Sequence, residues 1–92
     1  MLFVRLAFNA PNKDRERADN IAAHTAHLRS GAIDIVQSGP LFSTPDDARI
    51  GALIVFDAPT LAEVEAFNAA DPFIISGVYD DVRIMRWEKT IG

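Results

Sequence analysis

The alternation of apolar and polar residues predicts four β-strands in this chain. Apolar residues recur at a period of two, or run together, in four segments: 2–8, 32–42, 50–57 and about 80–88. Within the first segment one set of residues shares a face: Leu2, Val4, Leu6 and Phe8. Gly39 and Pro40 interrupt the second segment, which predicts a bulge or bend on an edge strand. The third segment is apolar almost throughout, as in a central strand, and forms a hairpin with the second.

Helical spacing of apolar residues predicts a first helix over residues 14–30. Its apolar positions are Ala18, Ile21, Ala22 and Leu28. Asn12 or Asp14 can cap the start of this helix, because both side chains accept hydrogen bonds from free backbone amides. Gly31 is placed to end the helix in a left-handed conformation.

A second helix is predicted over residues 61–69. Thr60 precedes it as a capping residue, with Glu63 three positions further on, which is the pattern of a capping box. Asp71 and Pro72 end this helix, because proline disfavours helical geometry in the residue before it. A short turn then leads to the last strand.

The element order β-α-β-β-α-β predicts a ferredoxin-like α+β fold in a single domain of residues 1–92. Such a fold has a four-stranded antiparallel sheet with both helices on one face. The first and third strands carry bulky apolar residues on both faces, so the other face of the sheet would leave an apolar patch in water. We therefore expect a homodimer that packs through this open sheet face.

Charge and composition narrow the classes of partner. The chain has 9 Lys and Arg against 13 Asp and Glu, a net charge of −4, and its basic residues are scattered, which argues against nucleic acid and anionic membranes. The apolar opening is short and contains Arg5, so we interpret it as a strand and expect no membrane segment. Cysteine is absent, which excludes disulfides and thiolate chemistry and fits a cytoplasmic protein.

Two histidines on the first helix are the main candidates for chemistry. At about 100° per residue, His24 lies roughly 60° from Ile21, on the shoulder of the buried side. His27 points further toward solvent. An unperturbed imidazole exchanges protons near neutral pH, and a carboxylate bonded to one ring nitrogen makes the other a better base. Asp71, at the end of the second helix, is the candidate carboxylate.

The alternatives for these residues are structural roles or metal binding. His24 can be a solvent-facing residue beside an Asp71 that merely ends a helix. His24 and His27, three positions apart, can also bind a metal, but their helix offers no third ligand, so we expect none. No glycine-rich phosphate loop is present, and we expect no cofactor.

Four further residues have both a functional and a structural interpretation. Arg17 lies on nearly the same helical row as His24 and can bind an anionic group, or be a solvated charge. Ser38 can offer a hydroxyl to a ligand at the Gly-Pro bend, or satisfy local backbone groups. Tyr79 and Trp87 are interpreted as packing or dimer-interface residues, with ligand contact as the less favoured alternative.

The sequence resembles the YciI-like family over almost its whole length. The resemblance rests on six segments: "HTAHL", "SGPL", "IGALIVFDA", "AFNAADPF", "SGVYDDVRI" and the late "RW". It implies a dimeric α/β barrel, in which two ferredoxin-like sheets pack face to face, and an active site of a His and an Asp that correspond to His24 and Asp71. His27 stands where the family usually has an aromatic residue, and Thr25 where it has an aliphatic one.

Our first hypothesis is a cofactor-independent enzyme of lyase or isomerase type, or like the dehydrochlorinases that the family includes. It would act on a small cyclic or aromatic acid or phenol in a cleft between the first helix and the sheet. His24 would be the general acid or base, Asp71 would orient it, and Arg17 and Ser38 would bind the substrate. The alternative is a non-catalytic dimeric module that binds a small ligand or assists a partner enzyme. An oxygen-dependent monooxygenase is a third possibility, because other dimeric α/β barrels oxidise quinols without a metal.

Overall fold

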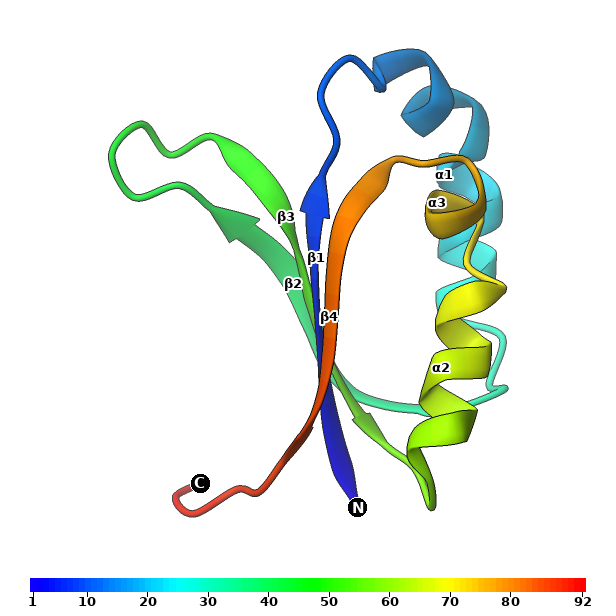
Figure 1. Ribbon diagram of the computed structural model, residues 1–92, viewed down its shortest axis with the longest axis vertical. Helices are drawn as coiled ribbons and strands as arrows, with labels where there is room; N and C mark the ends of the chain where they lie inside the picture. Colours follow the sequence, from blue (N-terminus) through cyan, green and yellow to red (C-terminus); the bar gives the residue numbers. More distant parts are fainter.

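A computed structural model describes all residues, 1–92, and confirms the ferredoxin-like fold. The elements follow the predicted order, with one short helix added: β1 (Leu2–Asn9), α1 (Asp14–Leu28), β2 (Asp34–Phe42), β3 (Arg49–Asp57), α2 (Leu61–Ala69), α3 (Pro72–Ile75) and β4 (Tyr79–Trp87). The four strands form one antiparallel sheet in the order β2-β3-β1-β4 (Figure 1). None of the helices is long and apolar enough to cross a membrane.

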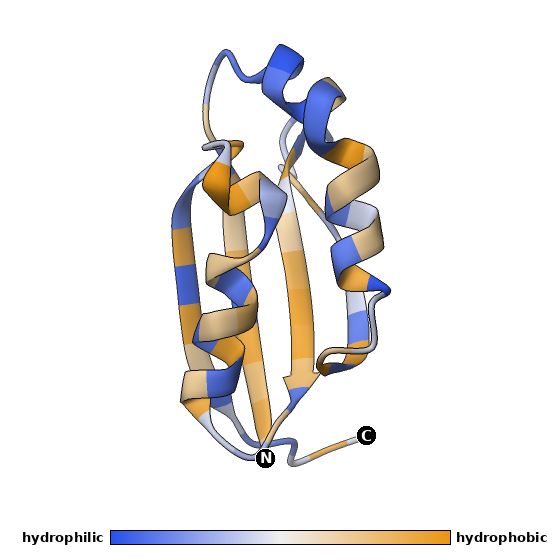
Figure 2. Ribbon diagram, turned by 90° about the vertical axis from the view of Figure 1, so that its right-hand side faces the viewer, coloured by the Kyte–Doolittle hydropathy of each residue, from blue (hydrophilic) through white to orange (hydrophobic).

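All three helices lie on one face of the sheet, and the opposite face is bare (Figure 1). Figure 2 shows α1 and α2 side by side across the sheet, with apolar residues along the central strands behind them. The main core lies between β1, β3 and α2, and its buried members are Phe3, Ile54, Phe56, Ala58, Val64 and Phe67. A second buried cluster holds α3 against the sheet through Ala7, Phe73, Val78 and Tyr79.

Strand β1 is central and directs its alternate residues to the two faces. The face that lies under the helices carries Phe3, Arg5 and Ala7, all of which are buried. The predicted apolar set from Leu2 to Phe8 does share a face, but this face is the open one. Arg5 pairs with Ile54 on β3 and Ile84 on β4, so it stands in the middle of the sheet.

The capping residue predicted for the start of α1 is wrong. The N-cap residue is Lys13, and no side chain makes the capping hydrogen bond. Asn12 has a φ of 60°, in the left-handed region that asparagine tolerates, and this turn leaves it outside the capping position. Gly31 has the expected positive φ, 78°, three residues after the helix ends.

The predicted buried side of α1 faces the sheet, and Leu28 packs against the main core, but the predicted burial of Ile21 is wrong. Ile21 is 45% exposed, and His24 is the buried residue of this helix. The reason is that this part of α1 covers a cavity. Ile21 and Leu28 line that cavity, so the apolar stripe of the helix lies over open space instead of packing fully against the sheet.

Two smaller predictions are corrected in β2 and after α2. The register of β2 against β3 shifts between Ile35 and Gln37 and again at Phe42, whereas Gly39 and Pro40 pair regularly. Pro40 is tolerated because β2 is an edge strand. The expected turn at residues 72–77 contains α3, which Asp71 caps by accepting from the Phe73 amide. Helix α2 begins and ends where predicted, and Thr60 accepts from the Glu63 amide.

Candidate active site

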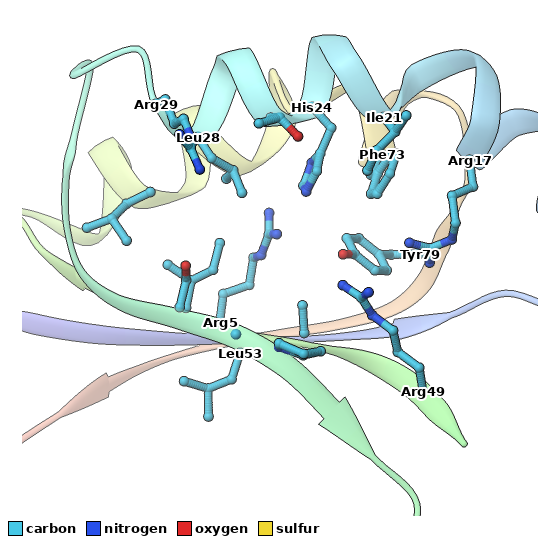
Figure 3. A pocket seen from close by; sticks show the side chains of 17 residues that line it. Arg5, Arg17, Ile21, His24, Leu28, Arg29, Arg49, Leu53, Phe73 and Tyr79 are labelled. Carbon is cyan, nitrogen blue, oxygen red and sulfur yellow. The ribbon is translucent and has the colours of Figure 1, made fainter. Parts of the chain in front are cut away.

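A cavity of about 400 Å³ lies between α1 and the sheet (Figure 3). Helix α1 forms one wall with Arg17, His24 and Leu28, and strands β2 and β3 form the opposite wall. Arg5 from the central strand β1 and Tyr79 from the edge strand β4 complete it. The predicted cleft between the first helix and the sheet is therefore present.

His24 and Asp71 are in direct contact. The Nδ1 atom of His24 lies 2.7 Å from Oδ1 of Asp71, and the two residues come from positions 47 apart in the sequence. Asp71 reaches α1 because α3 packs against α1, and its place as the N-cap of α3 fixes the direction of its carboxylate. Asp71 is fully buried and His24 is 8% exposed, so this hydrogen bond is shielded from water.

Three groups donate hydrogen bonds to the Asp71 carboxylate. Oδ1 accepts from His24 and from the Phe73 amide at 2.9 Å, and Oδ2 accepts from Nη1 of Arg5 at 2.9 Å. Burial raises the pKa of Asp71, but these hydrogen bonds and the His24 charge outweigh burial and lower this pKa below its usual 3.8. The carboxylate is therefore ionised near neutral pH and can only accept.

The ionised Asp71 determines the tautomer of His24. Because the carboxylate has no proton to give, Nδ1 of His24 must carry the hydrogen of their bond. A neutral His24 ring then has its lone pair on Nε2. His24 is one of the residues that line the cavity, so this nitrogen is the group available to a ligand. The pair can thus accept a proton at Nε2 and hold the resulting imidazolium against Asp71.

Phe73 fixes the plane of the His24 ring. The two rings are stacked with centroids 3.9 Å apart and planes 5° apart, and Phe73 is 1% exposed. Figure 3 shows Phe73 between His24 and Arg17. The Arg17 guanidinium lies 5.0 Å from the Phe73 centroid, and its Nη2 donates to Oδ1 of Asn9 at 2.7 Å. Arg17 is thereby held at the side of the cavity.

Ser38 lies on the opposite wall from His24. It pairs with Ile54 in the sheet and lines the cavity from β2, on the helix side. The structure therefore brings all four predicted site residues to the cavity or its border: His24, Asp71, Arg17 and Ser38. Their chemical roles stay predictions.

His27 does not point to solvent, contrary to the prediction from the helical wheel. Its ring stacks on Phe67 with centroids 4.0 Å apart, and its Nε2 donates to the Phe67 carbonyl at 2.9 Å. The cause is the position of α2, which lies beside the C-terminal half of α1. The two histidines thus bond to different partners, and no group of three His, Asp or Glu side chains is close enough to hold a metal ion.

Arg5 lines the cavity, although the sequence interpretation regarded it only as a charge in an apolar strand. Tyr79 also lines the cavity, whereas the sequence interpretation favoured packing or a dimer interface over ligand contact for this residue. A signal for Arg5 was present: it lies between Phe3 and Ala7 on one face of a central strand, where a charge must have a buried partner. Burial raises the pKa of Tyr79 above 10.0, so its hydroxyl is protonated near neutral pH.

Comparison with known families identifies one match that spans most of the chain. Residues 1–88 match the family described as YCII-related domain. None of the curated proteins is similar enough in sequence to be matched. One solved structure is similar in both sequence and fold: 5-chloro-2-hydroxyhydroquinone dehydrochlorinase (TftG) from Burkholderia phenoliruptrix AC1100, in complex with 2,5-dihydroxybenzoquinone. It is 31% identical with a TM-score of 0.80, over 96% of this chain and 94% of that one.

Two more distant structures share the fold alone. SnoaB, a cofactor-independent oxygenase from Streptomyces nogalater, is 13% identical with a TM-score of 0.52, over 98% of this chain and 93% of that one. The protein At3g17210 from Arabidopsis thaliana is 14% identical with a TM-score of 0.55, over 99% and 96% of the two chains. This fold therefore occurs in small-molecule enzymes of different reaction types.

Proposed function

This chain belongs to the family of YCII-related domains, and on that premise we propose that it is a cofactor-independent enzyme that uses His24 as a general acid or base. The observation that supports this function best is the shielded hydrogen bond of 2.7 Å between His24 and Asp71, at the wall of a cavity. The similarity to a dehydrochlorinase adds support. We infer that the substrate is a small cyclic or aromatic acid or phenol, which a cavity of about 400 Å³ can hold.

Each site residue has a distinct role in this proposal. Nε2 of His24 removes a proton from the substrate and can return it at a later step. Asp71 keeps the proton on Nδ1 and stabilises the imidazolium that forms. Arg17 binds an anionic group of the substrate from the side of the cavity, and Ser38 offers a hydroxyl from β2.

Loss of hydrogen chloride from a chlorinated hydroquinone is the reaction that we favour. The proton of one ring hydroxyl moves to the carbon that carries chlorine, which forms the first C=O bond and makes this carbon tetrahedral. His24 then takes the proton of a second hydroxyl, whose electron pair becomes part of the second C=O bond of the ring. The chlorine leaves as chloride with the electron pair of the C–Cl bond. The ring becomes a quinone, and no external oxidant is needed, because the carbon skeleton is oxidised as the C–Cl bond is cleaved.

A homodimer through the bare face of the sheet is part of the proposal. We define the open face by the apolar side chains that line its shallow hollow: Val4, Leu6, Leu53, Val55, Met85 and Trp87. Met85 is 48% exposed and Trp87 is 39% exposed, which is a large apolar surface for a monomer in water. A second copy of the chain would cover it sheet to sheet.

The first experiment measures chloride release from 5-chloro-2-hydroxyhydroquinone under anaerobic conditions. The variant is His24→Asn, whose amide can still donate to Asp71 but which has no basic nitrogen facing the cavity. We expect the wild type to release chloride and His24→Asn to be slower by about 10²-fold or more, the usual size of a general-base effect. Equal rates in the two proteins would exclude His24 as the acid or base.

His27→Gln is the matched control for this experiment. His27 is on the same helix but bonds to the Phe67 carbonyl, and a glutamine amide can take over the donor role of Nε2. We expect His27→Gln to release chloride at the wild-type rate. A requirement for oxygen, measured as oxygen uptake with the same hydroquinone, would favour the monooxygenase alternative.

A non-catalytic module that binds a small ligand is the second candidate function. Asp71 caps α3 and pairs with Arg5, so the same residues also support the fold. In that case His24→Asn would weaken ligand binding or stability, and the wild type would convert no substrate. Absence of chloride release by the wild type, with ligand binding intact, would favour this function.

A further inference from the structure

The cavity is lined by positive charges, although the whole chain is acidic. Four arginines and one histidine line it, and no Asp or Glu does: the arginines are Arg5, Arg17, Arg29 and Arg49. The whole chain carries 13 Asp and Glu against 9 Lys and Arg, so the charge of the cavity lining is opposite in sign to the net charge of the chain. Asp71, behind His24, offsets one of the positive charges through its ion pair with Arg5. The remaining field favours a negatively charged ligand.

Arg5 has hydrogen-bond donors that nothing in the chain satisfies. Its Nη1 donates to Asp71 at 2.9 Å and to Asn68 at 3.2 Å. Its Nε and Nη2 atoms are buried and have no partner. A buried donor without an acceptor is costly, and more so on a charged group, so such a group needs an explanation.

Tyr79 is a second unpartnered donor on the same side of the cavity. Its side chain is 7% exposed, and its hydroxyl makes no hydrogen bond within the chain. The Arg5 guanidinium carbon lies 5.6 Å from the centroid of the Tyr79 ring. Figure 3 shows the Tyr79 hydroxyl directed into the cavity toward Arg5, with the His24 ring on the opposite wall.

We propose that the Tyr79 hydroxyl and the unpartnered edge of the Arg5 guanidinium form a subsite for an anionic oxygen of the ligand, either a carboxylate or a phenolate. The oxygen would complete the hydrogen bonds that Arg5 and Tyr79 lack, and the ligand would lie between them and His24. Arg49 and Arg17, at the other side of Tyr79 in Figure 3, add positive charge to the lining of the same cavity. This inference rests on the proposed function, since it names the substrate class of the same cavity.

The subsite also has a consequence for the proposed reaction. When His24 removes a proton, negative charge develops on a ligand oxygen, and a donor aimed at that oxygen lowers the barrier. Arg5 is attached to Asp71, and Asp71 to His24, so the base and the oxyanion donor are held in one network. Because burial keeps Tyr79 protonated near neutral pH, its hydroxyl can donate throughout.

Binding of benzoate and of benzamide to the whole chain, measured by isothermal titration calorimetry, tests this proposal. The two probes have nearly the same shape, but only benzoate carries an anionic oxygen. We expect benzoate to bind about tenfold more tightly than benzamide, because a hydrogen bond to a charged group has about this effect on affinity. Similar affinities, or no binding of benzoate, would overturn the anionic subsite.

Tyr79→Phe tests the residue directly. It removes a hydroxyl that has no partner in the chain, so we expect the melting temperature to stay near that of the wild type. We expect benzoate affinity to fall about tenfold and benzamide affinity to stay unchanged, the difference again being one charge-assisted hydrogen bond. Unchanged benzoate affinity in a folded Tyr79→Phe would overturn the role of Tyr79.

Arg49→Gln and Arg15→Gln form a matched pair of variants that tests the effect of positive charge in the cavity. Both remove one positive charge, but Arg49 lines the cavity and Arg15 is exposed on α1 outside it. We expect only Arg49→Gln to weaken benzoate binding, and equal effects would indicate that net charge alone matters.

A measurement on the wild type keeps the proposal testable if Tyr79→Phe fails to fold. In ¹H–¹⁵N NMR spectra, the Nε–H signal of Arg5 is expected to shift when benzoate is added, and to stay in place with benzamide. An Arg5 signal that shifts with neither benzoate nor benzamide would contradict the subsite. None of these binding measurements depends on turnover, so a failure of the proposed catalysis would be seen separately, in the chloride-release experiment.

Discussion

Arg5 and Asp71 form an ion pair that is closed off from solvent. Nη1 of Arg5 lies 2.9 Å from Oδ2 of Asp71, and both side chains are 0% exposed. The pair joins the central strand β1 to the residue that caps α3, 66 positions away. Asp71 also holds His24, so one carboxylate serves both the stability of the fold and the orientation of the candidate base.

Replacement of Asp71 by Asn is expected to destabilise the protein strongly. The Arg5 charge would remain buried without a counter-charge, and breaking a buried pair in this way costs about 3–5 kcal/mol. Urea denaturation followed by circular dichroism measures this loss. Asp57→Asn is the control, because Asp57 pairs with the N-terminus at 50% exposure, and such surface pairs contribute less than about 1 kcal/mol. Equal losses in the two variants would contradict the importance of the buried pair.

The lowered pKa of Asp71 predicts how stability depends on pH. In the folded state this pKa lies below 3.8, so near pH 4 the unfolded chain binds more protons than the folded one. The contribution of Asp71 to stability is therefore complete above the unfolded pKa and is lost as pH falls through the folded value. Unfolding free energies measured from pH 6 to pH 2 should fall in the acid range. Asp71→Asn should have a shallower fall, and an unchanged pH dependence would argue against the shift.

Gly51→Ala is expected to destabilise the centre of the sheet. A Cβ atom at Gly51 would overlap the carbonyl group of Ala7 on the neighbouring strand, and backbone cannot move aside cheaply. Overpacking of this kind costs about 1–3 kcal/mol. Gly39→Ala is the control, since a Cβ there meets nothing within 4 Å. Denaturation curves of the two variants should differ clearly, and similar stabilities would show that β1 and β3 can separate to make room.

A charge on the open face is expected to break the proposed dimer. Sedimentation of the wild type at micromolar concentration should give twice the chain mass of 10.1 kDa, and Val4→Asp should give the mass of one chain. The reason is that sheet-to-sheet packing would bury the new carboxylate without a partner. Ile75→Asp changes an apolar residue on α3 that is 72% exposed, and it should stay dimeric. A wild type that sediments as a monomer would contradict the dimer.

The local chemistry of the sequence was sufficient to predict most element boundaries. Helix α2 is a clear case, because Thr60 supplies a cap at one end and Pro72 forbids continuation just beyond the other. The alternation of apolar and polar residues with a period of two was likewise enough to predict strands β1 and β4. These signals act over a few residues, so they do not depend on what the chain packs against. Helix α1 also begins where predicted, at Asp14, but the left-handed turn at Asn12 displaces the expected cap.

The pairing of His24 with Asp71 was a hypothesis from sequence, and its geometry depends on how distant segments pack. The helical period placed His24 near the buried side but could not tell a packed side from one that covers a cavity, which is why Ile21 is exposed and His24 is not. His27 was misplaced for a similar reason, since only the position of α2 provides the Phe67 ring and carbonyl that bind it.

The sequence by itself thus determined the order of the strands and helices along the chain, the residues that begin and end α2, and the family to which the chain belongs. These follow from contacts within a few residues and from a pattern that spans residues 1–88. Only the tertiary structure decided that Arg5 is buried against Asp71, that Tyr79 faces a cavity and that arginines surround it. The partner of a buried charge or hydroxyl lies on a segment tens of residues away in the sequence. The spacing of residues along one strand or helix does not identify that segment.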